Sequence, residues 1–292
     1  MDHRGFWPVS RMCRALRVSR SGFYSWAVRP FSERERRQNR LDCFVAESHS
    51  ASHRIYGYRK IHRDIVNNGL EDCCAETVRR AMLRLGIRSR RARKYVVTTD
   101  SNHDMSVAEN LIARDFSASG PNEKWLADIT YLATEEGWLY LAVILDCYSR
   151  YIAGWAMSDQ IDADLVCQAL ETALMRRRIP SSCSLIHHSD RGSQYASDKL
   201  SQMLADSGIK ISMSRKGDPW DNAMMESFFG SLKTEWIDGS FDTRKEAELE
   251  VFKYIEMFYN TVRLHENLDY VSPLDFERKF EQESENDGDK SA

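Results

Sequence analysis

The chain has 292 residues, of which 42% are hydrophobic and 29% are charged, and its formal net charge is −3. This length and apolar content allow about two folded domains and exclude a chain that is disordered throughout. The charge is segregated, because residues 1–100 hold 22 lysines and arginines against 10 acidic residues, and the remainder holds 19 against 34. A basic N-terminal part predicts a polyanionic partner, although a solvated basic face has the same composition.

Cysteine usage and hydropathy indicate the compartment. The seven cysteines are scattered and include no CxxC pair, which favours reduced thiols over a disulfide framework. The N-terminus is charged throughout, so no signal peptide is expected. The longest apolar stretch, Gly137 to Leu145, is too short to cross a bilayer. We therefore predict a soluble cytoplasmic protein that has no membrane partner.

Residues 1–95 are predicted to form a helical, basic DNA-binding region. Apolar residues recur at helical spacing in four segments: 8–27, 33–48, 55–68 and 76–85. The pair Asn68–Gly69 is a helix-ending signal, and two short helices around such a turn are typical of a helix-turn-helix. Arg79, Arg80 and Arg84 lie off the apolar face of the second helix and are candidates for DNA contact. The pattern alone leaves a three-helix unit without DNA contact equally open.

Residues 96–122 are polar, follow the basic run of residues 87–94 and reach Gly120–Pro121, so they are predicted to be a linker. From residue 123 to 280 the pattern changes to three strands followed by alternating helices and strands. This order predicts an α/β domain in which helices flank a mixed five-stranded sheet. The acidic tail, residues 281–292, is poor in apolar residues and is predicted to be disordered.

Three acidic residues in this domain are candidate catalytic and metal-binding groups. Asp128 lies within an apolar strand, Asp190 ends the strand SLIHHSD, and Glu226 lies on a helix. A carboxylate in an apolar strand is costly unless it is paired or binds a metal, and ligands collect beyond strand ends. Oxygen ligands favour Mg²⁺ or Mn²⁺, and two such ions can promote phosphodiester cleavage. Each acid alone is more typical of a surface position; the three together, with a basic region, favour catalysis.

Other polar residues are candidates for a functional or a structural role. Lys233 shares a helix face with Glu226 and is a candidate to bind a phosphate. Trp220 could stack on a base or anchor its loop. His187 and His188 could transfer protons, but packing at the strand end is favoured. We expect Asp146 and Arg150 to form an ion pair across a hairpin turn. The cluster Tyr259, Asn260, Arg263 and His265 either contacts DNA or braces the sheet.

Five segments occur in the order found in one known family: KWLADITYL, LDCYSRYIAGW, HHSDRGSQY, SMSRKGDPWDNAMMESFFGSLKTE and YNTVRLHENLDYVSP. With MCRALRVSRSGFYSW and RIYGYRKIHRDI upstream, the chain resembles OrfB-type transposases of the IS-three family, which belong to the DDE transposase and retroviral-integrase group. The resemblance implies an RNase H-like core and identifies Asp128, Asp190 and Glu226 as the catalytic acids, with Lys233 contacting DNA.

The resemblance also implies a reaction and its partners. Metal-dependent hydrolysis would release a 3′-hydroxyl at a transposon end, which then attacks target DNA. Such enzymes act on terminal repeats as multimers at the nucleoid, and often as a fusion with an upstream reading frame. One departure concerns zinc: His49 and His53 are followed by adjacent cysteines, Cys73 and Cys74, which are poorly placed for one tetrahedral ion. No zinc site is therefore predicted.

Two other functions fit parts of the pattern. His188-x2-Arg191 resembles the HxxR signature of tyrosine recombinases, but no tyrosine lies between Tyr195 and Tyr254 to act as the nucleophile. A non-catalytic DNA-binding regulator of the element requires only the basic N-terminal part. Such a regulator would bind DNA without metal and would tolerate substitution of the carboxylates.

Overall fold

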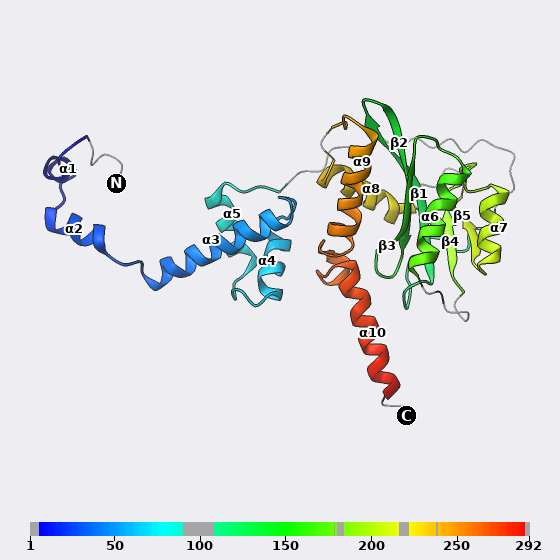
Figure 1. Cartoon of the computed structure of the whole chain (residues 1–292). Coiled ribbons are helices and arrows are strands. Elements are labelled where there is room, and N and C mark those ends of the chain that lie inside the picture. The colour runs from blue at the N-terminus through cyan, green and yellow to red at the C-terminus, as the bar shows by residue number, and fades with distance from the viewer. Residues whose placement is uncertain are drawn as a thin grey trace.

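The computed structural model describes residues 6–89, 108–177, 179, 184–215, 222–237 and 239–289, with side chains as far as residue 284. Five helices precede the sheet: α1 (Val9–Ala15), α2 (Arg20–Val28), α3 (Glu33–Ala51), α4 (Tyr58–Asn67) and α5 (Ala75–Leu85). Helices α1 and α2 form a pair at the end of α3 that is distant from the sheet (Figure 1). The helices predicted near residues 33–48, 55–68 and 76–85 are confirmed.

Helices α3, α4 and α5 pack together and are called the N-terminal helical unit below. A capping box between Ser32 and Glu35 starts α3. Gly69 and Gly86 follow α4 and α5 with φ of 64° and 67°, a conformation that glycine adopts without steric cost. The apolar faces meet in a common core formed by Leu41, Val45, Ile61, Ile65, Val78 and Ala81.

The predicted mixed five-stranded sheet is confirmed. Its strands are β1 (Lys124–Thr134), β2 (Gly137–Asp146), β3 (Ile152–Ser158), β4 (Ile186–Ser189) and β5 (Lys210–Met213). Their order across the sheet is β3-β2-β1-β4-β5. Short turns join β1, β2 and β3, which are antiparallel, whereas β4 runs parallel to β1 and β5 parallel to β4.

Helices cover both faces of the sheet (Figure 1). On one face lie α6 (Ala163–Arg176) and α7 (Asp198–Asp206), which pack over Trp125, Ala127 and Ile144. On the other lie α8 (Ala223–Glu235), α9 (Arg244–Phe252) and the π-helix η2 (Lys253–Tyr259). The core of this second face continues into the N-terminal helical unit, so the two units share one apolar cluster.

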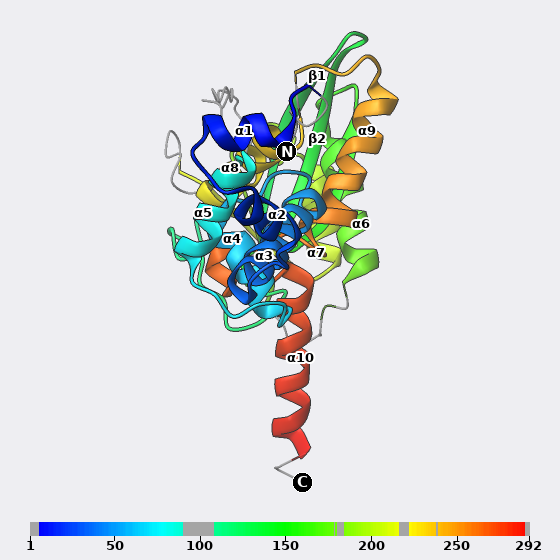
Figure 2. The ribbon, with the colours of Figure 1, turned by 90° about the vertical axis from the view of Figure 1, so that its left-hand side faces the viewer.

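The tail prediction is wrong for the described residues. After η3 (Glu266–Leu268), helix α10 runs from Pro273 to Asp289 and projects away from the sheet (Figure 1 and Figure 2). Its first turns are anchored, because Phe276 and Phe280 pack on Tyr148. Glutamate, glutamine and lysine are good helix formers, so the anchored helix extends through the polar sequence.

The predicted linker is partly folded onto the α/β unit. Ile112 is buried, and the Leu111 amide donates to Ser212 Oγ at 2.9 Å. The α/β unit therefore begins before residue 123, because this segment packs against β5. Residues 96–107 of the linker lie outside the described residues. Within the described part of the chain, no helix combines the length and apolar content needed to span a membrane.

Candidate active site

Two of the predicted acids lie side by side at the centre of the sheet. Asp128 is in the middle of β1, and β4 pairs with β1 in parallel, with Leu126 opposite His188. The same register, extended by two residues, brings Asp190 level with Asp128. Asp128 lies within the long strand β1, whereas Asp190 directly follows Ser189, the last residue of β4. Asp190 therefore stands at the carboxyl end of a parallel strand, where ligands of α/β sheets collect.

The third acid lies close enough to interact with the first. Burial is the main cause that raises the pKa of Asp128 to about 8, and the negative charges of Asp190 and, to a smaller extent, Glu226 contribute to this rise. The carboxylate has one short-range donor, the Ile129 amide at 2.8 Å. The charges of acids at the end of β4 and on α8 therefore both act on the Asp128 carboxyl of β1.

The Asp190 carboxylate is held by its own loop. Its Oδ1 accepts a hydrogen bond from the Gly192 amide at 2.9 Å. A Cβ at residue 192 would lie 3.0 Å from this oxygen and 2.6 Å from Gln194 Oε1, so glycine permits the tight turn. The Arg191 guanidinium donates to the Ser214 carbonyl at 2.7 Å and ties the loop to the end of β5.

The donor set fits a hard divalent cation. All three acids offer carboxylate oxygens, the ligands that Mg²⁺ and Mn²⁺ prefer. A cluster of acids that raises the pKa of one of its members favours a bound cation, because the cation would relieve the repulsion. Among the described residues, however, no three Asp, Glu, His or Cys side chains stand close enough to form a finished metal cage. Glu226 is exposed at the first turn of α8 and has room to change rotamer.

Tyr195 is a site residue that the sequence reasoning missed. Its hydroxyl is buried and has no hydrogen-bond partner among the described residues. Burial, followed by the charges of Asp128 and Asp190, raises its pKa well above the usual range. It therefore lies near both acids as a neutral hydroxyl. The available signal was its position five residues after Asp190 in the motif HHSDRGSQY.

Lys233 lies on α8 with Glu226, as predicted. Its ammonium is 4.9 Å from the centre of the Tyr131 ring on β1, a cation–π distance. Burial lowers the pKa of Lys233 to about 8. The lysine is half-buried and is therefore held against the strand that carries Asp128.

The chain is similar to known proteins along most of its length. Residues 118–219 and 207–273 match two models of the integrase core domain, and residues 34–95 match an HTH-like domain. The chain is 41% identical over 280 residues to the transposase InsF for insertion sequence IS3A of Escherichia coli strain K12, covering 95% of this chain and 96% of that protein. The chain belongs to the InsF family of insertion-sequence transposases. The family resemblance and the helix-turn-helix region are confirmed.

The transposase is also similar to other proteins. It is 41% identical over 272 residues to the insertion element IS600 uncharacterized 31 kDa protein of Shigella sonnei, covering 93% of this chain and 99% of that protein. Among solved structures, the catalytic core of BIV integrase is similar over 56% of this chain and 98% of its own, at 14% identity and a TM-score of 0.40. The catalytic core domain of HTLV-2 integrase in complex with magnesium is similar over 55% of this chain and 98% of its own, at 14% identity and a TM-score of 0.39.

Family membership makes the chain a DNA transposase, an enzyme of the polynucleotidyl transferase class. Its predicted DNA contacts lie outside the acid cluster. Arg79 and Arg80 are exposed on α5 and pair with Glu76 of the same helix, and Arg84 pairs with Asp42 of α3. Exposed ion pairs contribute little stability, so these guanidinium groups can exchange carboxylate for phosphate at small cost. Trp220 lies outside the described residues.

The ambiguous polar residues of the transposase have structural roles. His188 Nδ1 lies 2.8 Å from Ser212 Oγ in the sheet, and burial lowers the pKa of His187 to about 4, so His187 packs there as a neutral ring. Asn260 accepts from the Ile152 amide at 2.9 Å and donates to its carbonyl at 3.2 Å, which braces the start of β3.

The expected ion pair between Asp146 and Arg150 does not form. Asp146 is buried and accepts from the amides of Asn122 at 2.7 Å and Tyr148 at 2.8 Å. Burial raises its pKa to about 6. Arg150 instead shapes the turn through its backbone: its φ is 60°, and its amide donates a hydrogen bond to the Asp146 carbonyl at 2.9 Å. Backbone amides reach a strand-end carboxylate more directly than a long side chain does.

Proposed function

We propose that the transposase cleaves DNA at the ends of its insertion sequence and joins the resulting 3′-hydroxyl to target DNA at Asp128, Asp190 and Glu226. The observation that carries this proposal is the strand register that brings Asp190 level with Asp128, with Glu226 of α8 close enough to influence the Asp128 carboxyl. The test is metal-dependent nicking of a duplex that carries the element's end. An Asp190→Asn variant that nicks at the wild-type rate would exclude this site.

The three carboxylates would hold Mg²⁺ or Mn²⁺, and we propose two ions. When bound, such ions activate the attacking oxygen and stabilise the leaving oxygen of a phosphodiester. Asp128 would give up its proton as the cation binds, because its raised pKa keeps the carboxyl protonated near neutral pH. Lys233, on the same helix as Glu226, would pair with a phosphate beside the scissile bond.

DNA would be held by both units. The exposed arginines of α5, Arg79 and Arg80, together with Arg84, would contact terminal-repeat phosphates, and Trp220 would stack on a splayed base. Two ends must be held together for strand transfer, so we propose that a homo-multimer is the active form and that the upstream-frame protein of the same element is a partner. This substrate would place the enzyme at the nucleoid.

The raised pKa of Asp128 leads to a prediction about stability. Because the folded state binds this proton more tightly than the unfolded state, metal-free stability should fall as pH rises from about 4 towards 8. At pH 8, Asp128→Asn should be more stable than the wild type by about 1–2 kcal/mol and should unfold at a temperature a few degrees higher. This free energy is reduced because the side chain is partly exposed. Thermal unfolding across this pH range measures the difference.

Metal binding supplies the control for that experiment. Addition of Mn²⁺ at pH 7 should release protons from the wild type and fewer from Asp128→Asn, as measured by calorimetry in buffers of different ionisation enthalpy. Parallel melting curves for the two proteins from pH 4 to 8, with equal proton release, would show that Asp128 is an ordinary surface acid.

Salt dependence tests the DNA-facing arginines. The double variant Arg79→Ala, Arg80→Ala should reduce the slope of log K against log salt by about 1.8, because each lost phosphate contact contributes about 0.9. Arg278→Ala is a matched control, since Arg278 is exposed on α10 and also forms an i,i+3 ion pair, with Asp275. Equal slopes for the double variant and the wild type would show that these arginines of α5 do not contact DNA phosphates.

A further inference from the structure

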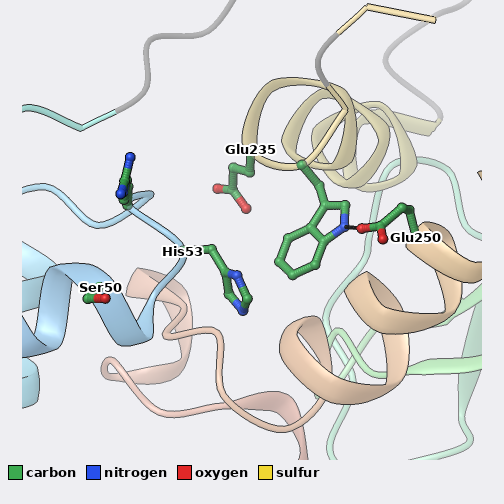
Figure 3. Close-up of a pocket in the computed structure, with 6 residues that line it drawn as sticks. Ser50, His53, Glu235 and Glu250 are labelled. Atoms are coloured by element: carbon green, nitrogen blue, oxygen red, sulfur yellow. Dashed lines mark hydrogen bonds between the residues drawn. The ribbon is translucent and has the colours of Figure 1, made fainter. Parts of the chain in front are cut away.

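The N-terminal helical unit contacts the catalytic unit at the C-terminal end of α8, the helix that carries Glu226. Figure 3 shows a pocket at this junction, with Ser50 and His53 on one side and Glu235 and Glu250 on the other. The residues that line it come from α3 and the turn after it, the end of α8, and α9. The two units therefore meet through the turn between α3 and α4.

The first contact is made by His53. Its ring centre lies 4.4 Å from that of Trp236, the residue that ends α8, and 5.6 Å from that of Phe258. His53 and the next residue, Arg54, have φ of 52° and 65°, two successive left-handed residues that are not glycine. Such a conformation costs energy and persists only where its surroundings enforce it. Here the strained turn directs the His53 ring onto the end of the catalytic helix.

The second contact is made by Tyr56, which is buried with 3% of its surface exposed. Its hydroxyl donates to the Val262 carbonyl at 3.0 Å and accepts from the Leu264 amide at 2.8 Å. These backbone groups lie on either side of Arg263. One hydroxyl of the N-terminal helical unit thus fixes the backbone of Arg263, about 200 residues later in the chain.

Arg263 in turn holds the last turn of α8. Its guanidinium makes a two-pronged pair with Glu235, with Nε donating at 2.7 Å. Both side chains are nearly buried, at 10% and 12% exposed, so the pair is well protected from solvent. The Tyr254 hydroxyl also donates to Glu235 at 3.1 Å. Glu226 lies two and a half turns earlier on this helix, about 13 Å along a rigid rod.

We propose that Tyr56 and His53 are positioning residues, through which the N-terminal helical unit sets the placement of α8 and hence of the Glu226 carboxylate. The inference rests on the proposed role of Glu226. Tyr56 acts through Arg263 and Glu235, and His53 acts through Trp236. DNA held by α5 would be coupled to the chemistry at the acid cluster through this junction, because α5 shares a core with α3 and α4, and the two contacts join that unit to α8.

Tyr56→Phe tests the first contact, since it removes one hydroxyl and keeps the ring that packs on Phe258. We expect wild-type affinity for a terminal-repeat duplex, an unchanged KM, and a kcat for nicking that is about 10-fold lower, because a small misplacement of catalytic groups is costly. Tyr140→Phe is the control, because the Tyr140 hydroxyl, on β2, has no hydrogen bond to the described residues. It should behave as wild type.

His53→Asn tests the second contact. Asparagine tolerates the left-handed backbone but lacks the ring. A loss of activity in this variant therefore reflects the lost Trp236 contact and not an added strain in the backbone. It should also lower kcat at constant DNA affinity, whereas His53→Tyr, which retains a ring, should recover most of the activity. Full activity in His53→Asn would show that the ring contact has no positioning role.

The outcomes separate this inference from the proposed function. If Tyr56→Phe retains wild-type kcat while Glu226→Gln is inactive, the positioning role is wrong and the acid site stands. If Tyr56→Phe loses DNA affinity and thermal stability together with kcat, the contact is merely structural and the inference fails. If Glu226→Gln is fully active, the proposed function itself fails, and the inference with it.

Discussion

Glu226→Gln is expected to reduce metal-dependent nicking and strand transfer by about 10²–10³-fold, the range observed when one preorganised electrostatic group is removed from an active site. Glutamine preserves the shape of the side chain but removes the negative charge that a divalent cation requires. Glu226 is exposed at the first turn of α8, so the core is untouched and the helix loses only a small dipole interaction. Single-turnover nicking of a duplex with the element's end measures the effect.

Glu248→Gln is the matched control for this prediction. Glu248 is exposed on α9, and the substitution makes the same chemical change at a position remote from the acid cluster. Both variants should bind terminal DNA as the wild type does, because neither residue is basic or lies on α5. Equal nicking by the wild type and Glu226→Gln, with binding intact in both, would instead favour the non-catalytic regulator.

Gly154→Ala is expected to destabilise the catalytic unit by about 3 kcal/mol, because inserting atoms into a closely packed contact forces backbone shifts. A Cβ at residue 154 would lie 2.3 Å from the Ala169 carbonyl oxygen and 2.6 Å from the Ala173 amide nitrogen. Both are backbone atoms of α6, so relief requires the whole helix to move off β3. At about 2–4 °C per kcal/mol, the melting temperature should fall by roughly 6–12 °C.

Gly230→Ala serves as the control, because it makes the same change in the interior of a helix. A Cβ at residue 230 of α8 would meet no atom within 4 Å. Alanine has the higher helix propensity, so this variant should be more stable than the wild type by about 0.5–1 kcal/mol. Thermal or denaturant unfolding of the two variants measures the expected loss of stability in Gly154→Ala and the expected gain in Gly230→Ala. A Gly154→Ala protein as stable as the wild type would contradict the close approach of α6 and β3.

Features specified by neighbouring residues were predicted well. The string KWLADITYLAT coincides with β1 because aromatic and β-branched residues favour strands and the flanking polar residues end them. The pair Asn68–Gly69 was expected to end a helix, and Gly69 follows α4 with φ of 64°. These signals act over a few residues, so they can be read without knowledge of the rest of the chain.

Two expectations failed because distant residues decide them. The tail was expected to be disordered from its composition, but Phe276 and Phe280 dock on Tyr148, more than 120 residues earlier, and start a helix that extends through the polar sequence. The Asp146 carboxylate was expected to form an ion pair with Arg150, but in the fold it accepts a hydrogen bond from the Asn122 amide. Neither partner can be identified from local spacing.

The sequence by itself determined most elements of this transposase and its sheet class, and it singled out the three acids as candidates, because periodicity, turn residues and motif order act locally along the chain. Only the tertiary structure placed Asp190 level with Asp128, set the pKa of Asp128, and joined Tyr56 to the backbone around Arg263. These properties depend on strand register, burial and contacts between residues far apart in sequence. Such quantities are set by packing in three dimensions, which no local pattern encodes.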